Sequence, residues 1–220
     1  MTTDEDVRLL VYESFAASGH PPTSGDIARA TGLVPAEAQA ALQRLAGARH
    51  IVLGDDASIV MAHPFAAVPL GFAVMGRQTL WWGGCAWDAF ALPHVLPEEG
   101  EVLVSTRCPG CGRALACNVG QVTPPEGSEV AHFLVPVSRI WDDVVHACGN
   151  QRLYCSQECV DRWLAQTGHP RGYVMDLATL WRLASHWYDG RLDRGYVRRE
   201  PIAAADYFRE VGLTGPFWGL

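Results

Sequence analysis

The sequence contains no lysine, and all seventeen of its basic residues are arginine. Its 24 acidic residues outnumber them, so the formal net charge at pH 7 is −7. A chain with this balance repels phosphate groups, which argues against a general nucleic-acid binder or a protein of acidic membrane surfaces. The composition therefore predicts neither a nucleic-acid partner nor a membrane partner.

Long apolar runs are also missing. The sequence has no stretch of about eighteen consecutive apolar residues, the length that a transmembrane helix requires. The chain begins with Met1 and continues into an acidic segment at positions 4–6. We therefore predict neither a transmembrane helix nor a signal peptide, and expect a cytoplasmic protein. Its seven cysteines stay reduced in that compartment, which favours metal binding or catalysis over disulfides.

Residues 1–64 have the pattern of a small helical domain. Apolar spacing and capping residues predict helices over 4–17 and 23–30 and a third that begins at Pro35. The segments 51–53 and 58–61 then predict a β-hairpin, which completes a winged helix-turn-helix. This region has four arginines and eight acidic residues. We therefore interpret it as a unit that packs against the rest of the chain rather than one that binds DNA.

Residues 65–220 have a different pattern. Short apolar segments at 73–75, 102–104 and 133–137 predict strands, separated by turns that contain glycine and proline. Helices are expected over 156–166, 176–188 and 203–211. Because strands and helices do not alternate regularly, the predicted fold class is α+β. The expected organisation is a winged-helix-like domain at 1–64 and a mixed α+β core at 65–220.

A thiol and a carboxylate stand three residues apart, at Cys85 and Asp88. The segment 86–92 is predicted to form a helix that ends at Pro93, so Asp88 lies about one turn from Cys85. Because a helix N-terminus stabilises a thiolate, we expect a lowered pKa for Cys85. A thiolate can bind a soft metal and a neighbouring carboxylate can carry a proton. The structural alternatives are a buried apolar cysteine and a first-turn aspartate that favours the helix dipole.

Cys148 is a second, isolated thiol that ends an apolar run over 144–147. Thiols from distant segments can share one soft metal, and we predict that Cys148 and Cys85 do so. We interpret the nearby His146 as an ordinary polar residue rather than a ligand.

Four further cysteines form two pairs. Cys108 and Cys111 flank a tight turn that resembles a zinc knuckle, and Cys155 and Cys159 lie at the start of a predicted helix, as in the second half of a treble-clef zinc finger. Four sulfurs satisfy a tetrahedral zinc ion. The four thiols either hold one structural zinc or are ordinary core and turn residues. Cys117 has the alternation of a strand and is expected in the core.

Together these motifs resemble the alkylmercury lyase, or organomercurial lyase, family over nearly the whole chain. The family's Cys-x-x-Asp motif matches Cys85 to Asp88. Its second catalytic cysteine follows an apolar run and precedes a strand and a Trp-bearing helix, which matches Cys148. A structural cysteine of the family matches Cys108, and the ending 211–218 is also similar. Well-studied members lack the second of the two cysteine pairs described above.

The resemblance implies a winged-helix-like domain that does not bind DNA, an α+β core, and protonolysis of an organomercurial R–Hg⁺ to R–H and Hg²⁺. Cys85 and Cys148 would bind mercury as thiolates. Asp88 would take a proton from one thiol and transfer it to the leaving carbon. No organic cofactor is implied. External thiols or a mercuric reductase would accept the Hg²⁺.

Other interpretations remain open at this point. The chain could be a non-enzymatic metal-binding regulator, although that function needs a basic recognition helix, or a trafficking protein that carries zinc, copper or mercury on the same thiols. Trp81, Trp82 and Trp87 either line an apolar pocket for the organic group or belong to the core.

Overall fold

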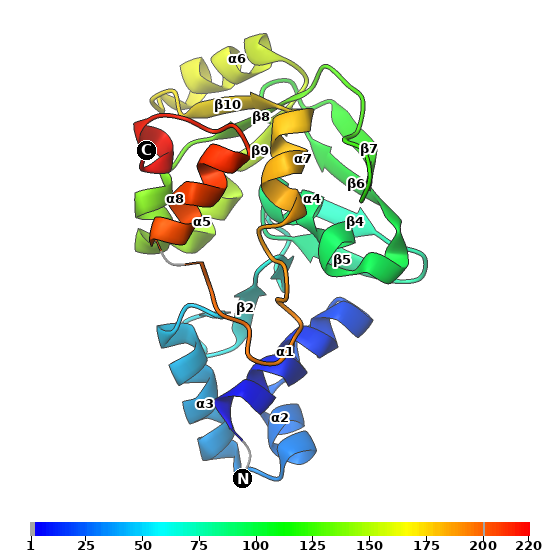
Figure 1. Cartoon of the computed structure of the whole chain (residues 1–220), viewed down its shortest axis with the longest axis vertical. Helices are drawn as coiled ribbons and strands as arrows, with labels where there is room; N and C mark the ends of the chain where they lie inside the picture. Colours follow the sequence, from blue (N-terminus) through cyan, green and yellow to red (C-terminus); the bar gives the residue numbers. More distant parts are fainter. Residues whose placement is uncertain (1–2, 200) are drawn as a thin grey trace.

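The computed structural model describes residues 3–199 and 201–220. Three helices lie at one end of the molecule, and a larger part that combines two antiparallel sheets with helices lies at the other (Figure 1). The fold is therefore α+β, as the sequence predicted. Among the described residues, we find no helix that combines the length and the apolarity needed to span a bilayer.

The N-terminal unit begins with three helices: α1 (Asp4–Ser18), α2 (Ser24–Thr31) and α3 (Pro35–Gly47). Thr3 and Thr23 cap the first two, because each side chain accepts the N–H of the aspartate three residues later. Gly19 and Gly32 end these helices in the left-handed region, with φ of 75° and 74°, which glycine adopts without strain. The sequence signals for these three helices were therefore sufficient.

The larger sheet has seven antiparallel strands in the order β1-β2-β3-β5-β4-β6-β7. Their bounds are β1 (Val52–Leu53), β2 (Ile59–Ala62), β3 (Phe65–Ala66), β4 (Phe72–Met75), β5 (Leu80–Gly83), β6 (Glu101–Arg107) and β7 (Ala114–Gly120). The predicted hairpin supplies β1 and β2. The sheet and the hydrophobic core therefore both continue across position 64.

The smaller sheet has the order β10-β8-β9. Its strands are β8 (Val130–Phe133), β9 (Gln151–Tyr154) and β10 (Tyr173–Asp176). The strand predicted over 133–137 is wrong beyond its first residue, because β8 ends at Phe133 and a 3-10 helix, η2 (Val137–Asp142), follows. β8 is the central strand, and Pro136 has no N–H to continue the ladder.

The remaining helices are α4 (Ala86–Val95), α5 (Val144–Gly149), α6 (Gln157–Thr167), α7 (Leu177–Ser185) and α8 (Pro201–Glu210), with short 3-10 helices η1 (Pro97–Glu99) and η3 (Pro216–Trp218). The expected end of α4 at Pro93 is wrong, since the helix continues to Val95. Every residue from Ala86 to Pro93 is buried. Burial of these eight residues outweighs the cost of a proline inside a helix, about 3 kcal/mol.

Residues 186–199, which we call the strap, join α7 to α8. The strap runs from the core down to α1 and back (Figure 1). Arg8 of α1 holds it there, because the guanidinium donates hydrogen bonds to the carbonyls of Arg191 (2.7 Å) and Asp193 (2.6 Å). The carboxylate of Glu5 accepts the N–H of Gly195 at 2.7 Å. These hydrogen bonds link α1 to the strap, which also carries a residue of the candidate active site.

Candidate active site

Cys85 is the N-cap of α4, directly after strand β5 and Gly84. Its Sγ accepts the backbone N–H of Asp88 at 3.4 Å and donates to Oδ2 of the same residue at 3.2 Å. A Cβ on Gly84 would collide with the Asp88 carboxylate, so glycine is required beside this pair. The expected contact between Cys85 and Asp88 is therefore present.

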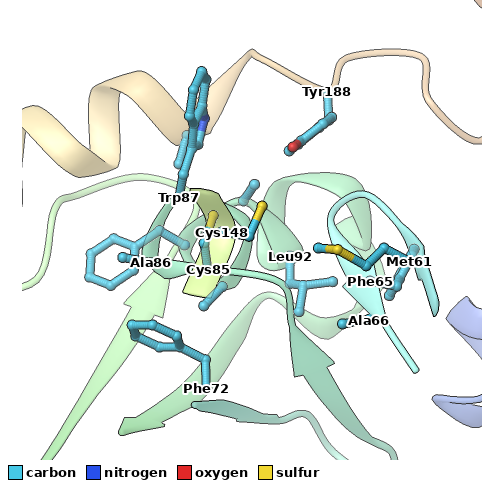
Figure 2. Close-up of a cluster of buried hydrophobic side chains, with 14 of the residues drawn as sticks. Met61, Phe65, Ala66, Phe72, Cys85, Ala86, Trp87, Leu92, Cys148 and Tyr188 are labelled. Carbon is cyan, nitrogen blue, oxygen red and sulfur yellow. The ribbon is translucent and has the colours of Figure 1, made fainter. Parts of the chain in front are cut away.

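Cys148 lies in the last turn of α5, and the fold brings it beside Cys85 (Figure 2). Both cysteines are only 2 % exposed, and Asp88 is 1 % exposed. The structure thus brings together the three residues that the sequence singled out, although 60 residues of chain separate Asp88 from Cys148 (148 − 88 = 60). The site is a buried pair of thiols, one of which is hydrogen-bonded to a carboxylate.

Two further residues contact this trio, and the sequence analysis did not identify them. Nε2 of His63 lies 3.4 Å from Sγ of Cys148. The hydroxyl of Tyr188, in the strap, donates to Oδ1 of Asp88 at 2.5 Å. His63 directly follows β2, and its only sequence signal was its position at the expected domain boundary. Tyr188 had no signal, since it fell at the end of a predicted helix.

The two thiols differ in acidity, and in the opposite sense to the sequence expectation. Burial raises the pKa of Cys85 well above its ordinary value, supported by hydrogen bonding to Cys148 and the charge of Asp88. The expectation of a lowered pKa at the helix N-terminus is therefore wrong, because desolvation exceeds the dipole effect. A hydrogen bond from Cys85 instead lowers the pKa of Cys148 to about 7, against the opposing effect of burial and with help from His63.

The carboxyl and the imidazole are also shifted. Burial raises the pKa of Asp88, although His63 and Tyr188 act in the opposite direction. For His63, burial is outweighed by the negative charges of Asp88 and Cys148, so its pKa is raised as well. The raised pKa of His63 and the lowered pKa of Cys148 favour an imidazolium beside a thiolate, and the raised pKa of Asp88 makes its carboxylate a better proton acceptor than an exposed one.

The three tryptophans near Cys85 have separate environments. Trp81 is a core residue, and its Nε1 donates to the carbonyl of Phe15 in α1 at 2.9 Å. Trp82 is half-buried in β5. Trp87 is buried in an aromatic cluster with Phe133, Trp187, Phe208 and Trp218. Trp87 also belongs to the same cluster of buried side chains as Cys85 and Cys148 (Figure 2).

Four of the five other cysteines form a second cluster. The Sγ atoms of this cluster all lie within 4.8 Å of one another, and they belong to Cys108, Cys111, Cys155 and Cys159. Cys117 lies in β7 and pairs with Val104 of β6, as expected of a strand residue, but it is half-buried and packs against the core rather than inside it. His146 is exposed on α5 beside Asn150, in agreement with its interpretation as an ordinary polar residue.

Both the sequence and the fold of this chain are similar to those of known proteins. The model of the alkylmercury lyase family matches residues 65–189, more than half of the chain. Among solved structures, the fold is similar to that of the mercury-bound form of MerB2, with a TM-score of 0.60 and 18% identity, covering 81% of this chain and 88% of that one. A search of curated proteins found no match.

Proposed function

Since this chain belongs to the alkylmercury lyase family and is an organomercurial lyase, we propose that Cys85, Asp88 and Cys148 cleave the carbon–mercury bond of its substrate. The observation that carries the proposal is the buried contact of Asp88 with one of two adjacent thiols. Carbon is a poor proton acceptor, so an acid held beside the metal-bound carbon accounts for much of the catalysis.

The first step is capture of the substrate by Cys148. A thiolate, not a thiol, is the nucleophile and metal ligand, and of the two cysteines Cys148 has the lowered pKa. His63, 3.4 Å from its sulfur, balances the negative charge. The Cys148 thiolate displaces the anionic group X⁻ from R–Hg–X, which leaves R–Hg bound to its sulfur.

The second step moves the proton of Cys85. Its Sγ lies 3.2 Å from Oδ2 of Asp88, within reach of proton transfer, so the thiol proton passes to that carboxylate as the thiolate binds mercury. Tyr188 holds the other oxygen, Oδ1, which leaves Oδ2 as the atom that receives the proton. Two thiolates on mercury load electron density onto the metal and weaken its bond to carbon.

The third step breaks the carbon–mercury bond. The protonated Asp88 transfers its proton to the carbon, R–H leaves with the electron pair of the broken bond, and Hg²⁺ stays on both thiolates. We propose that external thiols or a mercuric reductase then remove the Hg²⁺ and that protons return to the site. These steps need no organic cofactor. The aromatic cluster around Trp87 is the proposed contact for R.

Asp88→Asn is the experiment that tests this assignment. The variant keeps the size of the side chain and loses the proton carrier. Capture of an organomercurial should survive, whereas single-turnover release of R–H should fall by about 10² or more, the contribution typical of general acid catalysis. Near-native release would remove Asp88 from the mechanism, and a melting curve on the same preparation separates chemistry from instability.

Two cysteine variants test the thiols with the same assay. Cys85→Ala and Cys148→Ala should each abolish turnover in a folded protein, because one thiolate cannot hold mercury and complete the activation of its bond to carbon. Cys117→Ala is the matched control, since this thiol lies outside the site in β7. Near-native turnover in either site variant would contradict the two-thiol mechanism.

For the N-terminal unit we propose a winged-helix-like fold that docks rather than binds DNA. In support, all four of its arginines are engaged within the chain. Arg8 is fully buried against the strap, Arg44 and Arg29 pair with acidic side chains, and Arg49 lies over the ring of Trp141. A gel-shift assay at low salt should show no DNA retardation, and a retarded band at micromolar protein would contradict this proposal.

The alternative of a metal-binding regulator or trafficking protein is not favoured. The family match lies over the residues that carry the trio, and a carriage function gives no role to an acid that contacts only one of the two thiols. Hydrocarbon release from a model organomercurial in excess thiol distinguishes the two, since a carrier binds mercury without releasing R–H.

A further inference from the structure

We propose that Cys108, Cys111, Cys155 and Cys159 bind one structural Zn²⁺ ion, separate from the mercury site. The four sulfurs come from two segments and lie within 4.8 Å of one another. The Sγ atoms of Cys111 and Cys155 are 3.5 Å apart. A tetrahedral zinc with Zn–S bonds of about 2.3 Å spaces its sulfurs roughly 3.8 Å apart. The cluster therefore has the dimensions of a four-thiolate zinc site.

The first pair of ligands lies in the turn between β6 and β7. The turn is closed by the N–H of Gly112, which donates to the carbonyl of Cys108 at 2.8 Å, and by the N–H of Cys108, which donates to the carbonyl of Arg113 at 2.9 Å. Gly112 has φ of 75°, in the left-handed region. These contacts direct both sulfurs of the turn to the same side, as a zinc knuckle requires.

The second pair lies where β9 meets α6. Cys155 follows β9, and Cys159 is in the first turn of α6. The turn and the helix are in direct contact, since a Cβ on Gly110 would collide with the carbonyl of Cys159. The two halves are thus packed against each other as in a treble clef. Cys108 and Cys159 face the interior, and Cys111 is exposed, so one edge of the site is open to an incoming ion.

The chemistry of this donor set points to zinc rather than to the substrate metal. Four thiolates in a tetrahedral arrangement make a closed structural site with no position left for a substrate. The mercury site differs, because it has two thiols, a carboxylate and an imidazole.

The position of the cluster gives the zinc a role. Cys108 and Cys111 lie in the turn between two strands of the seven-stranded sheet, whereas Cys155 and Cys159 lie after β9 of the three-stranded sheet, at the start of α6. Arg152 also connects the two sheets, because its guanidinium, on β9, donates a hydrogen bond to the carbonyl of Arg107 in β6 at 3.4 Å. β9 directly follows α5, which carries Cys148. The zinc therefore fixes the Cys148 segment relative to the sheet that leads to Cys85. This role rests on the proposed mechanism, whereas the presence of the metal does not.

Metal analysis of the purified protein is the first test. Protein grown with zinc and purified without chelator should contain about one zinc per chain. After removal of the zinc under reducing conditions, added Co²⁺ should give the visible spectrum of tetrahedral cobalt with thiolate ligands. A protein that lacks zinc and gives no such spectrum, or one that holds iron in its place, overturns the assignment.

Variants locate the ion. Cys155→Ser should lose the zinc and the cobalt spectrum, and the Cys85→Ala/Cys148→Ala double variant and Cys117→Ser should keep both. Zinc that is retained by Cys155→Ser but lost from the double variant overturns the proposal. If Cys155→Ser does not fold, stepwise chelation of the wild-type protein replaces it: zinc release should lower the melting temperature. Zinc release with an unchanged melting curve overturns the structural role.

Discussion

In the proposed mechanism, the difference in acidity between Cys85 and Cys148 decides which thiol binds the substrate first. Both are buried, so burial alone would raise both pKa values. Cys148 differs because it receives a hydrogen bond from Cys85 and lies beside His63. Cys85 instead faces the carboxylate of Asp88. The trio therefore begins with one nucleophile and one proton donor rather than two equivalent thiols.

This assignment predicts a pH dependence for substrate capture. Because the pKa of Cys148 is lowered to about 7, the thiolate is lost as the pH falls through that value, and the capture rate should drop about tenfold per pH unit below it. His63→Gln removes the imidazolium, which raises the thiol pKa and moves the midpoint of the profile to higher pH. Stopped-flow capture of an organomercurial measures both profiles. An unchanged midpoint in the variant would show that His63 does not assist Cys148.

Tyr188→Phe tests the hydrogen bond to Oδ1 of Asp88. Without the 2.5 Å contact the pKa of Asp88 rises further, so the carboxyl group becomes a weaker acid toward carbon. Capture should be unchanged, and single-turnover release of R–H should fall by about tenfold, roughly the loss of one hydrogen bond to a charged group. Equal losses in capture and release would mean that Tyr188 only shapes the site.

Among the elements, the strap connects the N-terminal helices to the chemistry. Arg191 is buried, and its Nε donates to the carbonyl of His63 at 3.0 Å. Arg8 holds the backbone of the same segment from α1. The strap also carries Tyr188, so α1 positions a residue that contacts Asp88 without approaching the reacting atoms itself.

Arg8→Met should therefore weaken both stability and catalysis. The change removes a buried guanidinium that pairs with the partly exposed carboxylate of Glu5 and donates to two carbonyls, and the loss of a hydrogen bond that involves a charged group typically costs about 1.5–3 kcal/mol. Hydrogen exchange should speed up in residues 186–199, and R–H release should slow. The matched control is Arg29→Met, whose exposed pair with Asp26 should change the unfolding free energy by less than about 1 kcal/mol. A strap that exchanges at the native rate in Arg8→Met would contradict this role.

For the whole molecule, the continuous sheet and core predict a single unfolding transition. Strands β1 and β2 come from the N-terminal unit and extend the sheet of the core. In addition, Trp81 of β5 donates a hydrogen bond to the carbonyl of Phe15 in α1. One cooperative unit unfolds in an all-or-none manner.

The distribution of tryptophan makes this prediction measurable, because all eight tryptophans lie beyond residue 80. Urea unfolding followed by tryptophan fluorescence reports the larger part, and hydrogen exchange reports α1–α3. The two midpoints should coincide. A lower midpoint for α1–α3 would show that the helices unfold separately.

The sequence by itself determined the features that depend on neighbours along the chain. Thr3, Thr23 and the glycines after α1 and α2 set the ends of those helices. The three-residue spacing of Cys85 and Asp88 placed a thiol and a carboxylate one helical turn apart. The acidic balance of the N-terminal unit argues against DNA binding, which stays a prediction for the gel-shift assay.

The tertiary structure decided the features that depend on distant contacts and on burial. His63 meets Cys148 across 85 residues, and Tyr188 meets Asp88 across 100. Neither pairing leaves a periodic signal in the sequence. The acidity of the thiols was decided in the same way. The helix dipole at Cys85 is a local effect that favours the thiolate, but the cost of burying a charge is set by every segment that surrounds it, and that cost is larger.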